Sequence, residues 1–286
     1  MINKEITVGY WSTKALGSAL RMLVIYSGRP LRAKIYKLKA SIINNVTEFD
    51  GSSWHDGDKI ILKQTNNLIN LPYVEMYDED ENKILISQSL ACLSILGRKL
   101  NFFGKNSLEE IYCEQLLSET QDLRGLTSKF SYTIFNTKAE ELTEAKLVME
   151  KASNKINGKL LKFEEWLLQK KEDENKFFLV GNSISAPDFS LFDILDSYIA
   201  FITHYDFSSQ SNEKIYNSLG FACLSNFYNE FKKLPRMQKY FNSELYKLPY
   251  QNKAALFSSN NIPKKWDPLT EIDHTPDEIL IEGDIE

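Results

Sequence analysis

The chain has 286 residues, of which 43% are hydrophobic and 26% are charged, with a formal net charge of −5 and a pI near 5.5. This length and composition allow a sizeable buried core, in one large domain or two of ordinary size. The acidic balance argues against a surface that binds nucleic acid or an acidic membrane. The three cysteines, without CxxC spacing, argue against a disulfide framework or a structural zinc site.

The N-terminal third alternates between strand and helix patterns. Residues 5–11 form a short strand that ends in an aromatic pair, and apolar spacing from Leu16 to Val24 predicts an amphipathic helix. A polar stretch at 40–70 carries turn signals. The remaining expected elements here are strands at 33–38, 73–77 and 83–86 and a helix at 88–100. This order, with a proline just before the third strand, is thioredoxin-like, and such an X-Pro bond can be cis.

From about residue 107 onward, helical patterns replace the strand patterns. The expected helices lie at 107–135, 140–171, 185–201, 221–233 and 235–245, and the third of these is apolar nearly all round. The predicted fold class is therefore α/β + all-α. A thioredoxin-like N-terminal domain at 1–101 is followed by an all-helical domain at 107–258.

Residues 259–286 form an acidic C-terminal extension that we expect outside the compact fold. Its Trp266 and the apolar triplet at 279–281 leave two alternatives open. In the first alternative, the stretch around Trp266 docks across a groove or a pocket mouth while the last acidic residues stay mobile. In the second, the whole extension is disordered.

The chain carries no pattern that predicts secretion, membrane insertion or metal binding. Its first residues contain no apolar signal segment, and no run approaches the ~18 apolar residues of a membrane span. The three histidines are far apart in sequence. We therefore expect a cytoplasmic protein without a metal, and without nucleic-acid or membrane partners.

Segments spread from about residue 5 to about residue 258 resemble the mu-class cytosolic glutathione transferases. In chain order they are GYWSTKALGSALRMLVIYSG, NLPYVE, SQSLACLSILGRKL, FLVGNSISAPDFSLFDILD and LSNFYNEFKKLPRMQKYF. The resemblance implies a homodimeric enzyme of detoxification. Such an enzyme conjugates the thiolate of glutathione, its co-substrate, to small hydrophobic electrophiles.

By this resemblance, Tyr10 is the catalytic residue and donates its hydroxyl to the glutathione sulfur. A free thiol has a pKa near ~8.5, so little thiolate exists at neutral pH. A donor aimed at the charged sulfur stabilises it, and a shift of ~2 pKa units corresponds to ~2.7 kcal/mol. Without the resemblance, the better interpretation of Tyr10 is one of an aromatic pair that ends a core strand.

The resemblance also implies the remaining glutathione contacts. Gln88 and Ser89 begin a helix, whose N-terminal N–H groups suit the γ-glutamyl carboxylate, although Ser89 also reads as a simple cap. Asp58 stands where the family has a lysine, which leaves Lys59 as the candidate for the glycyl carboxylate. The full implied set is Tyr10, Trp11, Leu16, Trp54, Lys59, Asn70, Leu71, Pro72, Gln88, Ser89 and Asp122.

Asp122 would reach glutathione bound to the neighbouring subunit, unless it is only a solvated helix charge. The electrophile pocket would be lined by Thr13, Gly125, Ser128 and Tyr132, unless Tyr132 packs in the core. Leu68 replaces the aromatic residue that locks the family's subunits together, which predicts a looser dimer.

Two acidic motifs read as structural rather than catalytic. Ser185 and Asp188 form a capping signature, and Asp193 and Asp196 share one helix face. Two functional alternatives to the transferase stay open. One is a glutathione-dependent isomerase of the sigma kind, such as a prostaglandin D synthase, and the other is a non-catalytic protein that stores hydrophobic ligands such as haem.

Overall fold

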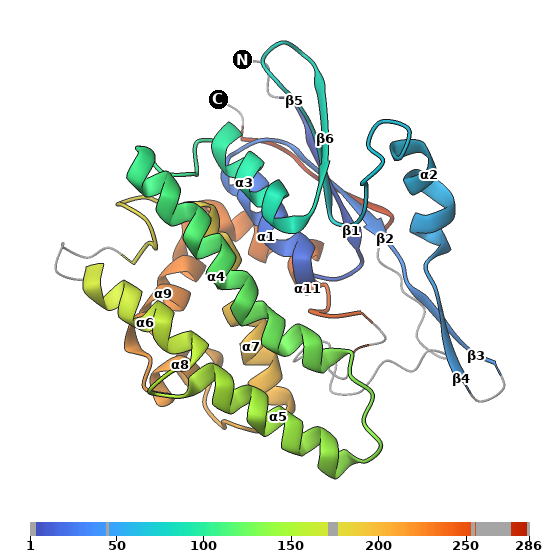
Figure 1. Cartoon of the computed structure of the whole chain (residues 1–286). Helices are drawn as coiled ribbons and strands as arrows, with labels where there is room; N and C mark the ends of the chain where they lie inside the picture. Colours follow the sequence, from blue (N-terminus) through green and yellow to red (C-terminus); the bar gives the residue numbers. More distant parts are fainter. Residues whose placement is uncertain (1–3, 44–45, 171–176, 253–254, 256–275, 285–286) are drawn as a thin grey trace. The chain divides into compact units, whose positions relative to one another are not determined.

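The computed structural model describes residues 4–43, 46–170, 177–252, 255 and 276–284 (Figure 1). These residues fold as two compact units. The first unit takes residues 4–100, 235–252 and 276–284, and the second takes 101–234 and 255. The sequence places the boundary near the same residues, but it assigns 235–252 to the helical part. The stretch around Trp266 lies outside the described residues.

The first unit is built on a five-stranded sheet with the order β6-β5-β1-β2-β7. Strands β1 and β2 are parallel, and the other neighbouring pairs are antiparallel. Alternate residues such as Val8, Ala33 and Val74 are fully buried, beneath helices that pack on the sheet and on each other. The elements are β1 (Ile6–Trp11), α1 (Ala15–Tyr26), β2 (Leu31–Tyr36), β5 (Tyr73–Tyr77), β6 (Lys83–Ser87) and α3 (Ser89–Lys99). This confirms the predicted thioredoxin-like order.

The polar stretch at 40–70 holds more regular structure than its composition suggests. Strands β3 (Lys39–Ile43) and β4 (Val46–Asp50) pair as a separate hairpin, visible beyond the end of β2 in Figure 1. A π-helical turn, η1 (Ser53–Asp58), and the short helix α2 (Lys59–Leu62) follow. The β-branched residues of KASII and VTEFD favour strands, but each segment is too short to show a clear alternation.

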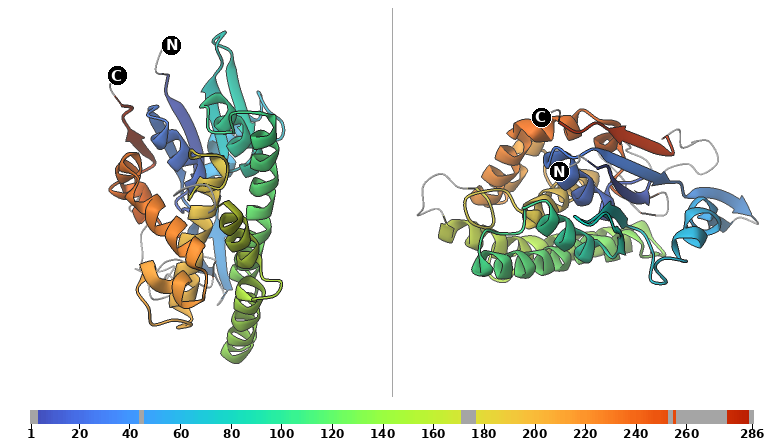
Figure 2. Two further views of the ribbon diagram at one scale, coloured as in Figure 1. Left: turned by 90° about the vertical axis from the view of Figure 1, so that its left-hand side faces the viewer. Right: turned by 90° about the horizontal axis from the view of Figure 1, so that it is seen from above.

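The described part of the C-terminal extension is the edge strand of the sheet. Strand β7 (Glu278–Ile281) pairs antiparallel with β2, as the dark-red arrow beside the blue strand shows in Figure 2. Ile279 lies opposite Ala33, and the backbone N–H of Asp284 donates to the Gly28 carbonyl at 2.9 Å. For these residues the expectation of an extension outside the compact fold is therefore wrong.

The second unit is helical, as predicted. Its helices are α4 (Ser107–Ser131), α5 (Lys138–Ser153), α6 (Lys159–Lys170), α7 (Ala186–His204), α8 (Ile215–Ser218) and α9 (Ala222–Lys233), with a 3-10 turn, η2 (Asn212–Lys214). The single helix expected at 140–171 is two helices. The Asn154 side chain accepts the N–H groups of Ile156 and Asn157 at 2.8 and 3.2 Å, which stabilises a turn between them.

The residues after 234 return to the first unit as short helical turns. These are η3 (Pro235–Met237), α10 (Gln238–Phe241) and α11 (Glu244–Lys247), in place of the continuous helix expected at 235–245. They pack along α1, where the hydroxyls of Ser18 and Tyr240 are hydrogen-bonded at 2.7 Å in a buried position. This segment therefore supports the helix that follows Tyr10.

Candidate active site

The strand register brings most of the expected site residues to one end of the sheet. Tyr73, the first residue of β5, lies between Gly9 of β1 and Ser87 of β6. The residues next to these three are therefore neighbours, and they are Tyr10, Pro72 and Gln88. The Leu71–Pro72 peptide bond is cis, as the sequence suggests.

The side chain of Tyr10 packs closely against the backbone of α1 at Gly17. This side chain is buried, at 7% exposure. A Cβ atom on Gly17 of α1 would lie 2.8 Å from the Cβ and Cδ1 of Tyr10, so only glycine fits beneath the ring. Gly9 serves the neighbouring side chain in the same way, because a Cβ there would lie 2.0 Å from Cε1 of Tyr73. Two glycines thus allow two tyrosines to sit against the backbone.

The loop after Tyr10 is fixed from inside the unit by Arg21. This arginine is fully buried in α1 and donates to the carbonyl oxygens of Thr13 at 2.9 Å and of Trp11 at 3.4 Å. Sequence reasoning gave Arg21 no role. A charged residue on the apolar stripe of a helix is the signal that could have found it.

The second part of the site is the start of α3. Gln88 precedes the helix with a φ of 76° and is exposed, while Ser89 is half-buried in the first turn. The first N–H groups of a helix have no partner inside it and carry the positive end of the helix dipole. Ser87 donates its hydroxyl to the Leu68 carbonyl at 3.0 Å, which ties the loop before Pro72 to this turn.

The other residues expected around glutathione lie at different depths. Asn70 is exposed, Leu71 is half-buried and Pro72 is buried. Trp11 and Leu16 are both half-buried beside the loop that follows Tyr10. These five residues belong to the same unit as Tyr10.

Trp54 lies in the core of the first unit. Its side chain is fully buried, stacked on the ring of Tyr73 at 5.8 Å and edge-on to Tyr36 at 5.0 Å. The indole N–H has no hydrogen-bond partner among the described residues. The indole N–H is also closed off from solvent, and the contact of Trp54 with the glycyl end of glutathione stays a prediction.

The loop beyond Trp54 contains a small charged network. Asp58 accepts Lys34 at 2.7 Å and the Tyr36 hydroxyl at 2.6 Å. Burial alone would raise the pKa of Asp58, but these hydrogen bonds outweigh it and hold the pKa below its ordinary value. Lys59 lies next to this network, with Nζ 3.4 Å from Nδ1 of His55.

The second unit contains the remaining expected residues. Asp122 pairs with Lys159 of its own chain at 2.8 Å, which lowers the pKa of this exposed carboxyl group. Along the same helix, Gly125 is exposed with open space where a Cβ would lie, and Ser128 is half-buried. Tyr132 follows the helix with 46% of its side chain exposed, so it is not a core residue. The contact of Asp122 with a neighbouring subunit stays a prediction.

The acid pair on α7 is structural, as the sequence indicates. Asp193 is buried and accepts Arg124 at 2.7 Å, and Asp196 accepts the Tyr228 hydroxyl at 2.8 Å. Both carboxylates therefore hold helices of the second unit together.

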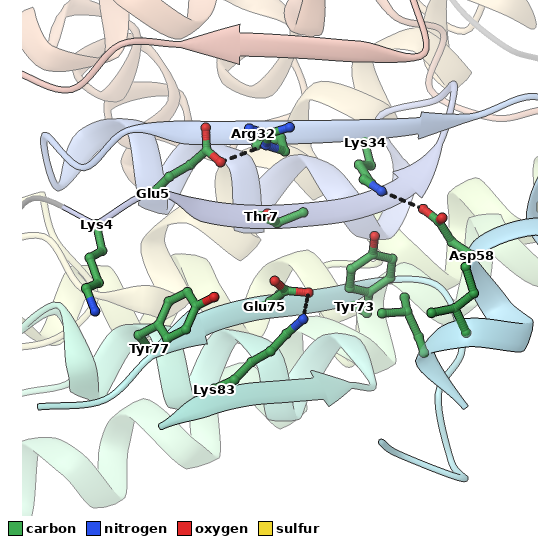
Figure 3. Close-up of a pocket in the computed structure, with 12 residues that line it drawn as sticks. Lys4, Glu5, Thr7, Arg32, Lys34, Asp58, Tyr73, Glu75, Tyr77 and Lys83 are labelled. Carbon is green, nitrogen blue, oxygen red and sulfur yellow. Dashed lines mark hydrogen bonds and ion pairs between the residues drawn. The ribbon is translucent and has the colours of Figure 1, made fainter. Parts of the chain in front are cut away.

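A cavity of about 510 Å³ lies on the outer face of the sheet, beside α2 (Figure 3). Six of its charged lining residues form the three ion pairs drawn as dashed lines, and Lys4 pairs with Glu81. The three ion pairs are Arg32 with Glu5 at 2.6 Å, Lys34 with Asp58 at 2.7 Å, and Lys83 with Glu75 at 2.8 Å. An anionic ligand would have to displace these carboxylates, so the cavity is not the candidate site.

Within the residue ranges that the structure describes, no helix combines the length and the apolar character that crossing a membrane requires. Within the same ranges, no three histidine, cysteine, aspartate or glutamate side chains cluster closely enough to hold a metal ion.

The chain is similar in sequence to glutathione S-transferases. A family model described as the C-terminal domain of glutathione S-transferase matches residues 122–244. The chain is 29% identical to the class-mu 26 kDa glutathione S-transferase of Schistosoma mansoni over 258 residues, covering 90% of this chain and 98% of that protein. It is 27% identical to glutathione S-transferase 2 of Gallus gallus over 198 residues, covering 69% and 77% of the two chains.

A solved structure extends the likeness to the fold. The crystal structure of the glutathione S-transferase Blo t 8 superposes with a TM-score of 0.67 at 19% identity, covering 87% of this chain and 98% of that chain. The likeness therefore spans both units and nearly the full length of that protein.

Proposed function

We infer that the chain is a mu-class-like glutathione transferase, and we propose that it transfers the glutathione thiolate to small hydrophobic electrophiles. The observation that carries the proposal is the register around Tyr73, because it gathers Tyr10, Pro72 and Gln88 at one end of the sheet. The curated relatives that carry the name glutathione S-transferase support it. Their names favour the transferase over the isomerase and the haem-binding alternatives.

In the proposed reaction, the chain's own groups bind and orient glutathione. The hydroxyl of Tyr10 donates to the sulfur and stabilises its charged form. The start of α3, with Gln88 and Ser89, offers N–H and hydroxyl donors to the γ-glutamyl carboxylate. The backbone of Leu71, beside the cis bond, is the natural partner for the peptide part of glutathione.

The direct test is an assay of 1-chloro-2,4-dinitrobenzene conjugation, with and without glutathione, on a sample that is also titrated with haem. We expect conjugation that depends on both the protein and glutathione. Haem binding in a protein that fails to accelerate conjugation would favour ligand storage instead.

Replacing Ser89 with alanine should weaken glutathione binding by about 1 kcal/mol or more, because a hydrogen bond to a carboxylate is charge-assisted. Calorimetry measures the affinity, and thermal melting reports whether the fold is intact. Ser94→Ala, later in the same helix, is the matched control. Unchanged affinity in an intact Ser89→Ala protein would leave this residue with a capping role only.

We also propose a cytoplasmic homodimer in which Leu68 contributes to the subunit contact. Its side chain is 82% exposed in a single chain, so it is available for contact with a partner subunit. Leu68→Glu should weaken dimerisation at least tenfold, because it places a charge in an apolar contact. Analytical ultracentrifugation measures the dimerisation constant. The control is Ile134→Glu, which places the same charge on an apolar side chain that is 94% exposed in the second unit. A fully active wild-type monomer at assay concentrations would contradict the dimer.

A further inference from the structure

The loop that follows Tyr10 contains a lysine buried between two aromatic rings. Lys14 is only 5% exposed. Its ammonium lies 3.9 Å from the ring centre of Tyr246 and 4.0 Å from that of Tyr250. Both rings belong to the segment after α10, which lies in the same unit as Tyr10. A cation that has lost water is attracted strongly to aromatic faces, so this contact ties the two segments together.

The backbone adds to the same connection. The N–H groups of Lys14 and Ala15 donate to the carbonyls of Pro249 at 2.8 Å and Tyr250 at 3.1 Å. Ala15 has a φ of 25°, which is a costly conformation for a residue with a Cβ. A conformation of this kind persists only where the surroundings hold it, and here the segment at 246–250 provides the hydrogen bonds.

The connection continues from Lys14 to the ring of Tyr10. The carbonyl of Lys14 accepts the N–H groups of Gly17 and Ser18, both at 2.9 Å, and so begins α1. The ring of Tyr10 rests on Gly17, where no side chain would fit. The position of Lys14 therefore sets the first turn of α1, and that turn sets the orientation of the Tyr10 ring.

We propose that Lys14 is a positioning residue for the transferase reaction, which couples the aromatic segment at 246–250 to the orientation of Tyr10. The role rests on the proposed function, because it acts through the hydroxyl of Tyr10 on the glutathione sulfur. Lys14 itself need not touch the substrate.

The test compares variants on both sides of the contact. Lys14→Met and Tyr250→Leu should each lower kcat about 3- to 30-fold, the range that loss of a buried cation–π contact corresponds to. Each should also raise the pKa of the bound glutathione thiol, with little change in the KM for glutathione. Lys14→Arg keeps the cation and Tyr250→Phe keeps the ring, so kcat and the thiol pKa of both variants should stay close to those of the wild type. The double variant Lys14→Met/Tyr250→Leu should be no slower than the slower single variant.

A matched control removes a similar contact elsewhere. The ammonium of Lys155 lies 3.2 Å from the ring centre of Phe221 in the second unit, and Lys155→Met should leave the thiol pKa unchanged. A loss of rate in Lys14→Met without one in Tyr250→Leu would overturn the proposal, since the charge alone would then be responsible. Equal rates in all variants would overturn it as well.

Hydrogen exchange separates this proposal from the assignment of the enzyme. In the free protein, Tyr250→Leu should accelerate exchange at the amides of Lys14 and Ala15 about tenfold, whether or not glutathione binds. Unchanged exchange would overturn the connection itself. If calorimetry instead detects no glutathione binding by the wild type, while exchange responds as expected, the transferase assignment is the part that fails.

Discussion

Replacing Tyr10 with phenylalanine should slow conjugation about 10- to 100-fold and raise the pKa of the bound glutathione thiol. A hydrogen bond from a tyrosine to a charged acceptor contributes about 1.5–3 kcal/mol, and each 1.36 kcal/mol is a factor of ten in rate. The ring itself stays, so its packing on Gly17 should be preserved. The absorbance of the thiolate, titrated against pH in the complex, measures the pKa directly.

The control for this variant is Tyr77→Phe, the same chemical change on β5, where 40% of the side chain is exposed. It should leave both the rate and the thiol pKa unchanged. Glutathione affinity should change little in Tyr10→Phe, because most of the contacts remain. A thiolate that titrates in Tyr10→Phe as it does in the wild type would show that another group stabilises the sulfur.

Much of this site could be predicted because its residues lie at the ends of regular elements. Tyr10 is the penultimate residue of β1, Pro72 precedes β5 and Gln88 precedes α3, and each boundary carries a sequence signal of its own. Apolar periodicity predicts the elements, and the thioredoxin-like order then predicts that these ends meet. The resemblance to a known family supplied the chemistry, which periodicity does not contain.

The features that sequence reasoning missed depend on contacts between distant segments. Lys14 and Tyr250 lie far apart in sequence, and the local sequence around one residue does not indicate its contact with the other. Strand β7 has only four residues, and its alternation becomes meaningful only beside the edge of β2. Trp54 packs against the rings of Tyr36 and Tyr73, an aromatic cluster that no local pattern indicates. Tertiary packing decides such positions, and local propensity does not record it.

The capping motif of α7 is one local signal that the structure bears out, and it leads to the largest stability effect we expect. Asp188 is fully buried and accepts the backbone N–H groups of Leu179 and Ser185 and the Ser185 hydroxyl, each at 2.7 Å. Burial raises the pKa of Asp188 to about 6, a rise that the hydrogen bonds oppose. The side chain is therefore still a carboxylate at pH 7, and it can accept all three donors.

Asp188→Ala should lower the free energy of unfolding by about 3–5 kcal/mol, because it leaves two buried backbone N–H groups without an acceptor at about 1–3 kcal/mol each. Denaturant unfolding at pH 7 measures the loss. The matched control is Glu140→Ala at the start of α5, where a similar capping arrangement is exposed. There Glu140 accepts the Asn136 N–H at 2.9 Å and donates its own N–H to Thr137 at 3.1 Å. Water can replace the carboxylate at that site, so the control should lose less than about 1 kcal/mol. Equal losses in the two variants would mean that burial does not set the strength of the cap, and that α7 is held by its apolar packing alone.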